Sequence, residues 1–243
     1  MSLLVAIVVA ATALVQSLFG VGILAFGTPT LLLMDVPFAE ALGVLLPASL
    51  TMSLLQIWRG SGADRGFVRA FAVAGVPPLI VGLSAVLIWG FAPALHGVIG
   101  AMLALFVVQR LVPDVGGRAR AWLVRHTNAW MSLAGLVHGL SNLGGPLVLM
   151  LASARSTDRH VVRTSMATAY AGFAASQLAV LGLLTPAVLT RTSLFTATVS
   201  AVTFLAVGDR IFRGLTGRFF ERALTALAGV YAAVLGARAA GVL

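Results

Sequence analysis

Long apolar runs, separated by short polar segments, dominate the hydropathy pattern of this 243-residue chain. A helix needs about 20 apolar residues to cross a bilayer. Runs of this kind predict transmembrane helices at residues 39–58, 67–89, 93–111, 162–184, 188–207 and 220–240. The pattern therefore predicts an all-α polytopic membrane protein.

Two further apolar segments, residues 3–34 and 129–151, do not fit this simple pattern. Each is too short for two crossings of about 20 residues, and each has glycine and proline near its centre. Such a segment either crosses once as a broken helix or forms a re-entrant hairpin that enters and leaves on one side. Two crossings give eight transmembrane helices with two of them broken, whereas two hairpins leave six.

The arginine distribution distinguishes these topologies, because cytoplasmic loops carry an excess of basic residues. In the six-helix topology only Arg191 and Arg238 lie on one side, and the other 14 of the 16 basic residues lie on the opposite side. The eight-helix topology divides them nine to seven. The charge pattern therefore favours hairpins. No arginine precedes Arg59, so residues 3–34 are assigned as a hairpin only by analogy with residues 129–151.

Composition supports the membrane assignment and limits the other classes. Hydrophobic residues make up 60% of the chain, charged residues 9%, and the mean hydropathy is +1.04, whereas soluble proteins contain about 25% charged residues. The net charge of +9 comes from arginine alone, and cytoplasmic loops explain it better than nucleic-acid binding. Cysteine is absent, which excludes disulfides and cysteine-ligated metals. We expect no metal and no other cofactor.

A glycine–proline pattern occurs once in each half of the chain. The matching residues, at an offset of 117, are Gly22, Gly27 and Pro29 in GILAFGTP and Gly139, Gly144 and Pro146 in GLSNLGGP. The sequence thus divides into a first membrane repeat (1–111), an arginine-rich cytoplasmic connecting loop (112–128) and a second membrane repeat (129–243). One hairpin and three crossings per repeat would invert the second repeat relative to the first. Inverted repeats with broken helices are typical of secondary transporters.

The paired stretches QSLFGVGILAFGTPTLLLM and GLSNLGGPLVLM resemble the motifs of the sulfite exporter TauE/SafE family. The resemblance covers essentially the whole chain. It implies a multi-pass transporter of the bacterial cytoplasmic (inner) membrane that exports sulfite or a small organosulfonate. The expected partners are a small anionic substrate and the lipid bilayer. A homo-oligomer is allowed, and no nucleic acid is expected.

The glycine–proline breaks themselves suggest an anion site. Proline in the first turn of a helix loses no needed donor, which predicts that half-helices begin at Pro29 and Pro146. A helix start leaves free N–H groups and a partial positive charge, and glycine lets an anion approach the backbone closely. Two facing helix starts would hold a compact oxyanion without a buried cation, and we expect the protein to carry it by alternating access.

Polar side chains near the breaks complete the predicted substrate site. Ser49, Ser53 and Gln56 lie near one helix face, and Gln177 takes the place of Gln56 in the second half. The alternative for any serine or threonine is that it only packs against neighbouring helices and bonds its own backbone. The predicted substrate-binding residues are Gly27, Thr28, Pro29, Thr30, Ser49, Ser53, Gln56, Ser141, Asn142, Gly144, Gly145, Pro146 and Gln177.

His138 is the histidine that stands beside a break. Three roles are open to it: a proton relay, transient pairing with the anion, or a hydrogen bond from a neutral ring to the hairpin backbone. The offset of 117 aligns it with Val21, so the fold does not demand a histidine there.

Three other functions compete with a transporter. A channel for a small anion, or a permease for another metabolite, would also use glycine-rich re-entrant loops. An intramembrane serine protease is not expected, because Ser141 and His138 lie three residues apart on one segment and no separate helix with a Gly-x-x-x-His motif supports a dyad. A sensor or assembly subunit would need larger loops than this chain offers. We therefore expect no enzyme activity.

Overall fold

A computed structural model describes residues 2–60, 62–90, 92–111 and 117–214, together with residues 226, 229–230, 232–234 and 236–237. Every secondary-structure element in these residues is a helix, which confirms the predicted all-α class.

The helices before residue 112 are α1 (Ser2–Phe19), α2 (Ile23–Leu33), α3 (Phe38–Trp58), α4 (Arg65–Ala70), the π-helix η1 (Phe71–Gly75), α5 (Val76–Trp89) and α6 (Ala92–Leu111). The later ones are α7 (Gly117–Arg125), α8 (Thr127–Ser141), α9 (Gly145–Arg155), α10 (Arg159–Leu184), the 3-10 helix η2 (Pro186–Val188), α11 (Arg191–Thr203), the π-helix η3 (Phe204–Gly208) and α12 (Asp209–Gly214). The segment 112–128, predicted as a loop, therefore contains α7 and the first residues of α8.

Within the described residues, four helical stretches are long and apolar enough to cross a membrane, as expected for a membrane protein. They are Phe38–Trp58, Arg65–Trp89, Arg159–Leu184 and Arg191–Ile211. They match four of the six predicted transmembrane helices. The predicted helix 93–111 corresponds to α6, and most of the predicted helix 220–240 lies outside the described residues.

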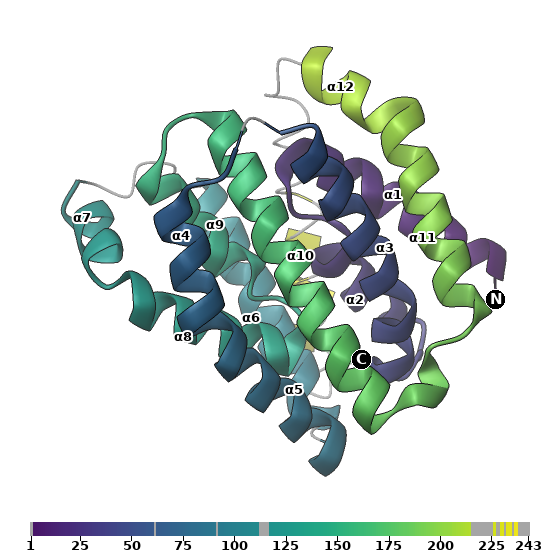
Figure 1. The fold of residues 1–243 in the computed structure, drawn as a ribbon. Helices are drawn as coiled ribbons and strands as arrows, with labels where there is room; N and C mark the ends of the chain where they lie inside the picture. The colour runs from purple at the N-terminus through teal and green to yellow at the C-terminus, as the bar shows by residue number, and fades with distance from the viewer. Residues whose placement is uncertain are drawn as a thin grey trace.

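Helices α3 and α10 pack against each other in the middle of the molecule (Figure 1). On one side of this pair, α11 and α2 contact α3, and both also contact α1. On the other side, α5 packs against α8 and α10, and α9 contacts α8 and α10. Helices α3 and α10, which carry Ser49, Ser53, Gln56 and Gln177 of the predicted site, are thus enclosed by elements from both halves of the chain.

Pro47 lies inside α3, where it would normally weaken a helix. Because proline has no N–H, the carbonyl of Gly43 loses its helical donor. Ser193 of α11 donates its hydroxyl to this carbonyl at 2.7 Å, and Thr196 donates to the carbonyl of Val44 at 2.8 Å. A neighbouring helix thereby satisfies backbone that lipid could not, and α11 is held against α3.

The same arrangement recurs where α5 begins. Pro78 removes the helical donor for the carbonyl of Ala74, one residue before the end of the π-helix η1. Ser132 of α8 donates its hydroxyl to that carbonyl at 3.0 Å. A serine on the adjacent helix again compensates for a proline.

Glycines allow α5 and α8 to approach each other closely. A methyl group on Gly135 would collide with the carbonyl of Gly75, and one on Gly139 with the carbonyl of Leu79. The two α8 glycines are four residues apart, the spacing of a small-residue packing motif in membrane helices. Gly139, which the sequence grouped with the helix break, instead lies inside α8 and allows it to pack on α5.

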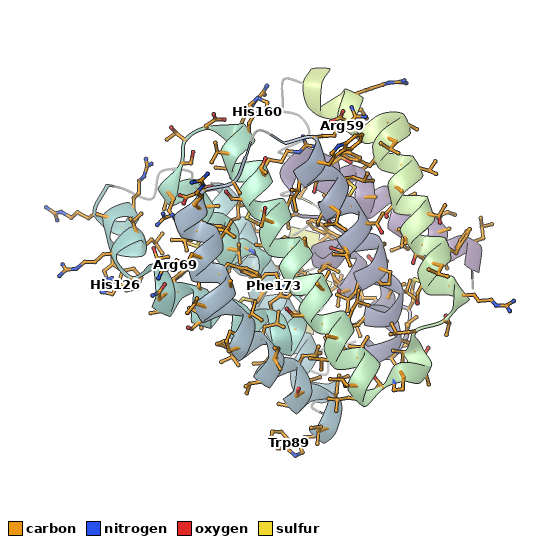
Figure 2. All side chains as sticks on the ribbon, viewed as in Figure 1. Arg59, Arg69, Trp89, His126, His160 and Phe173 are labelled. Carbon is orange, nitrogen blue, oxygen red and sulfur yellow. The ribbon has the colours of Figure 1, made fainter. Side chains whose placement is uncertain are left out.

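Figure 2 labels side chains that lie at the two ends of the molecule. Arg59 and His160 lie at the end of the molecule where α3 ends and α10 begins. Trp89, at the end of α5, lies at the opposite end and is largely exposed. Arg59 and Trp89 therefore lie at opposite ends of the molecule.

Candidate functional site

The break between α1 and α2 is a tight reversal built on two glycines. Gly20 has a φ of 70° and donates its N–H to the carbonyl of Gln16 at 2.8 Å. Gly22 lies so close to the backbone of Thr12 and Gln16 that a methyl group there would collide with both. The side chain of Gln16 then accepts the N–H of Ile23, the first residue of α2, at 3.1 Å. A carboxamide of α1 therefore caps the start of α2.

The break between α8 and α9 repeats this geometry. Asn142 has a φ of 63° and donates its N–H to the carbonyl of His138 at 2.7 Å. A methyl group on Gly144 would collide with the carbonyl of Ala134 and with the side chain of His138. The N–H of Gly144 donates to Nδ1 of His138 at 3.2 Å. An imidazole of α8 therefore satisfies backbone at the start of α9.

These contacts correct the alignment of the two breaks. Gly20 corresponds to Asn142, Gly22 to Gly144 and Gln16 to His138, each at an offset of 122 residues rather than 117. The helices that follow agree, because α2 (Ile23–Leu33) shifted by 122 coincides with α9 (Gly145–Arg155). The counterpart of His138 is thus Gln16 and not Val21.

Beyond the second break, α9 runs back along α8. Gly144 lies against Ala134, and the indole N–H of Trp130, near the start of α8, donates to the carbonyl of Leu147 at 2.7 Å. Near the other end of α9, Nε of Arg120 in α7 donates to the carbonyl of Ala154 at 2.6 Å. The start of α8 and the end of α9 therefore lie on the same side of the break.

Of the two half-helix starts predicted at Pro146 and Pro29, only the first is confirmed. Pro146 lies in the first turn of α9, as expected. Pro29 does not start a helix: α2 begins at Ile23, and Gly27, Thr28, Pro29 and Thr30 lie inside it. That prediction was wrong because Gly22, with its close backbone contacts, makes the break. Gly22 lies six residues before Thr28, the residue that precedes Pro29. The α-carbon of Gly27 instead faces the side chain of Leu45 on α3.

The second break and helix α2 are joined by one buried hydrogen bond. The side-chain amide of Asn142 donates to the hydroxyl of Thr28 at 2.8 Å, and both residues are fully buried. Both were predicted to belong to one site, and the structure brings them together. Because Thr28 lies within α2, the bond joins the tip of one reversal to the body of the other.

His138 is completely buried in an aromatic environment. Its ring stacks on Phe173 of α10, with centroids 3.8 Å apart and the planes 10° from parallel. The ring of Tyr170 meets it edge-on at 5.9 Å. Because Nδ1 accepts the N–H of Gly144, a neutral ring carries its proton on Nε2. This Nε2 is buried without a hydrogen-bond partner among the described residues.

Tyr170 lies against the first residue of α9. Gly145 has no side chain, and a methyl group there would overlap the hydroxyl of Tyr170. That hydroxyl is buried and bonds to nothing in the described part of the chain. A helix start, a hydroxyl donor and the Nε2–H of His138 therefore belong to one buried neighbourhood.

Glutamines from α3 and α10 adjoin the two breaks. Gln56 donates its side-chain amide to the carbonyl of Gln16 at 2.8 Å, and Gln16 donates to the hydroxyl of Ser53 at 3.2 Å. Gln177 lies next to His138, but neither atom of its carboxamide makes a hydrogen bond of normal geometry within the described residues. We call His138, Gly145, Tyr170 and Gln177 the α9 site.

Several buried polar atoms around the breaks have no hydrogen-bond partner in the described structure. Inside the α9 site they are His138 Nε2, the Tyr170 hydroxyl and both polar atoms of the Gln177 carboxamide; outside it they are Ser49 Oγ, Gln56 Oε1 and Asn142 Oδ1. An unpaired buried polar group costs about 1–3 kcal/mol. A protein retains so many in one region when a ligand or water supplies the missing bonds.

Other predicted donors are already used by the fold. The hydroxyl of Ser141 donates to the carbonyl of Val137 at 2.7 Å and accepts the N–H of Leu143 at 3.3 Å. Thr30 donates to the carbonyl of Phe26 at 2.5 Å. These hydroxyls bond to local backbone, the alternative that the sequence had left open. The hydroxyl of Ser141 also makes no hydrogen bond to His138 in the described structure.

Sequence reasoning missed Gln16, Tyr170 and Phe173. Gln16 had a usable signal, because QSLFGVG aligns with HGLSNLG at the offset of 122 and pairs Gln16 with His138. Tyr170 is one of only two tyrosines in the chain and stands in an alanine-rich helix. Its place opposite Gly145 depends on how α10 is rotated against α9, and no local pattern encodes that.

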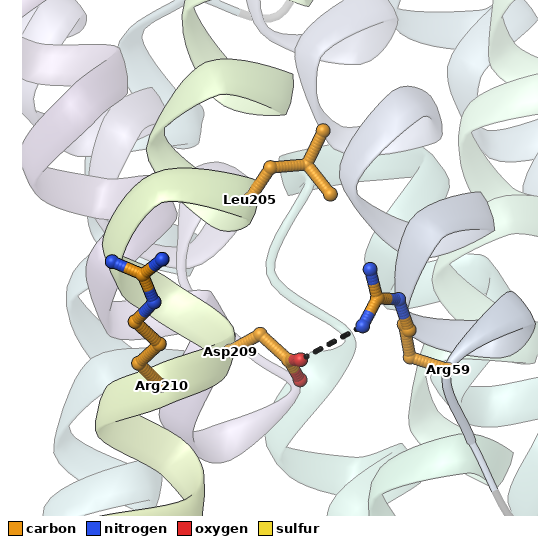
Figure 3. A pocket seen from close by; sticks show the side chains of 4 residues that line it. All are labelled: Arg59, Leu205, Asp209 and Arg210. Carbon is orange, nitrogen blue, oxygen red and sulfur yellow. Dashed lines mark ion pairs between the residues drawn. The ribbon is translucent and has the colours of Figure 1, made fainter.

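A separate cavity of about 260 Å³ lies at the arginine-rich end of the molecule, lined by Arg59, Leu205, Asp209 and Arg210 (Figure 3). Arg59 pairs with Asp209 at 3.5 Å and lies over the ring of Trp58 at 4.7 Å. These contacts join the end of α3 to the start of α12.

The geometry defines an all-helical protein with membrane-length helices and a buried polar site beside two matched helix breaks. Comparisons of the chain with protein-family models, with curated proteins and with solved structures found no match. The interpretation of the site therefore depends on its own chemistry.

Proposed function

We propose that this protein is a secondary transporter that moves a small sulfur-containing anion, sulfite or an organosulfonate, across a bacterial cytoplasmic membrane. The anion binds at the α9 site. The observation that carries the proposal is a group of buried donors without a hydrogen-bond partner among the described residues. Tyr170 and His138 adjoin the start of α9, and Gln177 lies beside His138. The resemblance of the two breaks to the TauE/SafE motifs suggests the class of anion and the direction of export.

The donor chemistry suits an oxyanion. The hydroxyl of Tyr170, the Nε2–H of His138 and the amide of Gln177 are neutral donors, and the start of α9 adds a partial positive charge. Hydrogen bonds to a charged partner are roughly twice as strong as those between neutral groups. A compact anion with several oxygens can accept all of them at once, whereas a cation would meet donors where it needs acceptors.

The matched breaks support two inverted repeats, each with a re-entrant hairpin. An offset of 122 relates the breaks, and each break folds the chain back on the helix before it. If α1–α2 and α8–α9 enter from opposite sides, their tips meet near the middle of the membrane, where transporters of this kind bind substrate. The bond between Asn142 and Thr28 supports this arrangement, because it joins the tip of the second reversal to helix α2 of the first.

Burial of the site favours alternating access over a channel. His138, Asn142 and Gln177 each have no exposed surface in the described structure, whereas the lining of an open pore is wet. Arg59 and Arg210 line the cavity at the arginine-rich end, and there they would raise the local concentration of anions.

Ligand-dependent stability of the purified protein tests the proposal. Sulfite, sulfoacetate, taurine and thiosulfate are compared for their effect on thermal unfolding, with sodium chloride of equal ionic strength as the reference. We expect at least one oxyanion to stabilise the protein, and Tyr170→Phe to weaken that binding about tenfold or more because one donor is lost. Thr198→Ala is the matched control, since this exposed hydroxyl bonds only its own helix. No stabilisation above sodium chloride, or equal affinity in Tyr170→Phe, would overturn the proposal.

A further inference from the structure

Helix α7 (Gly117–Arg125) is short, basic and amphipathic. Its sequence, GRARAWLVR, has three arginines and no acidic residue. Within the described structure, Arg118 and Arg125 are exposed and neither forms an ion pair. A helix of this kind on a membrane protein has the composition expected at a lipid headgroup layer.

The outward face of α7 combines cations with an aromatic ring. Arg118, Trp122 and Arg125 share one face, because they are separated by four and three residues. Trp122 is 53% exposed and its ring packs on that of His126 at 4.8 Å. Tryptophan prefers the membrane interface, where its ring is apolar and its N–H can meet water or headgroups.

The opposite face of α7 is attached to α9. Leu123 is buried, and Nε of Arg120 donates to the carbonyl of Ala154 in the last turn of α9 at 2.6 Å. Cations near the end of a helix stabilise it through the helix dipole. The outward and inward faces of α7 therefore have different partners.

A second connection runs through the tryptophans. Trp122 meets Trp130 edge-on, with ring centroids 6.2 Å apart, and the indole of Trp130 donates to the carbonyl of Leu147 in the first turn of α9. The exposed face of α7 is thus linked to the start of α9, and Arg120 is bonded to its end.

We propose that α7 is a binding site for the headgroups of anionic phospholipids, and that bound lipid stabilises the α8–α9 pair. The phosphates bind Arg118 and Arg125, and Trp122 inserts among the headgroups. Lipid bound there holds α7 in place, and α7 in turn holds both ends of α9. This inference does not depend on which substrate the protein carries.

Lipid-dependent unfolding of the purified full chain in neutral detergent tests this inference. Phosphatidylglycerol is added to one sample and phosphatidylcholine to another. We expect phosphatidylglycerol to raise the Tm by about 3 °C or more relative to phosphatidylcholine, because each basic residue near an anionic surface contributes measurably to binding. The double variant R118Q/R125Q should lose most of this increase, while Arg191→Gln, at the start of α11, should keep it. Inorganic phosphate at the same concentration should have no effect.

A separate variant tests whether lipid bound at α7 stabilises α9. Arg120→Gln should still retain phosphatidylglycerol in native mass spectrometry, but its Tm should respond less to the lipid. Equal Tm in the two lipids, an unchanged response in R118Q/R125Q, or an equal response to inorganic phosphate would overturn the lipid site. A full response in Arg120→Gln would overturn the coupling.

Discussion

At the residue scale, Gln16 and His138 take the same place at the two helix breaks, although one is a carboxamide and the other an imidazole. Each side chain accepts a backbone N–H where the chain starts a new helix. The imidazole differs in its second nitrogen, because Nε2 makes no hydrogen bond of normal geometry within the described residues. His138 therefore has two roles. It accepts a backbone N–H at the start of α9, one of the roles that the sequence left open, and its Nε2–H is a donor suited to the proposed anion.

The contact of Gly145 with Tyr170 yields the first prediction. Gly145→Ala places a methyl group on the Tyr170 hydroxyl, and we expect a loss of about 1–3 kcal/mol from overpacking. Tyr170→Phe removes the hydroxyl, so the double variant G145A/Y170F should recover most of that stability. Chemical unfolding of the four proteins measures the coupling. Additive losses in the double variant would show that the two groups do not touch.

Residues near the second break could be predicted from sequence better than those near the first. Pro146 follows two glycines, and this local signal placed the start of α9 correctly. Pro29 follows Gly27 in the same way, yet α2 begins at Ile23. The difference is tertiary, because the contact of Gly22 with Thr12 and Gln16 sets the break, and one sequence window does not reveal it. The contacts of Tyr170 with Gly145 and His138 could not be predicted for the same reason, because they depend on tertiary packing.

At the element scale, hydroxyls on neighbouring helices satisfy the carbonyls that prolines free. We expect Ser193→Ala to lower the free energy of unfolding by about 1 kcal/mol or more, because the carbonyl of Gly43 loses its donor and the N–H of Thr190 loses its acceptor in the capping box of α11. Thr198→Ala on the same helix should change it by less than about 0.5 kcal/mol. Unfolding of both variants in the same detergent provides the comparison. Equal effects would mean that the proline-freed carbonyl needs no partner.

The connection between α3 and α4 is tied to the end of α9 by an ion pair. Nε of Arg155 donates to Asp64 at 2.9 Å, and Asp64 also caps α4 by accepting the N–H of Phe67. The hydrogen bond from Arg155 is the largest cause that lowers the pKa of the Asp64 carboxyl below its usual value.

A pH dependence follows from that lowered pKa. The pair contributes stability above the unfolded pKa of about 4, and the contribution is lost as the pH falls through the lower folded pKa. Tm measured between pH 6 and pH 3 should therefore fall more steeply in the wild type than in Asp64→Asn. An identical acid limb in both proteins would show that Asp64 does not stabilise the fold through its charge.

At the scale of the whole molecule, the arrangement of the helices relative to the membrane decides whether the α8–α9 pair is a re-entrant hairpin. The chain has no cysteine, so single cysteines report cleanly. Asn128→Cys and Thr157→Cys, at the two ends of the pair, should both label from the cytoplasmic side, whereas Ala187→Cys in η2 should label only from the other side. All three positions are exposed. Labelling of Asn128→Cys and Thr157→Cys from opposite sides would restore the eight-crossing topology.

Hydropathy predicted the helical class and four of the membrane-length helices, because span length and apolar content are local properties. The paired glycine–proline pattern was visible but misaligned, since two glycines and one proline are a weak guide. The offset of 122 is set by the contacts at the two breaks, such as those of Gln16 and His138. The topology that the arginine count favours stays a prediction, because it depends on how the helices lie in a membrane.

The central claim is that the α9 site carries an oxyanion through alternating access, and counterflow in proteoliposomes tests it most directly. Vesicles loaded with unlabelled sulfite should take up external labelled sulfite transiently above equilibrium, and Tyr170→Phe should reduce this uptake about tenfold at low substrate while Thr198→Ala keeps it. Uptake that shows no stimulation by internal sulfite, or that is unchanged in Tyr170→Phe, would contradict the account.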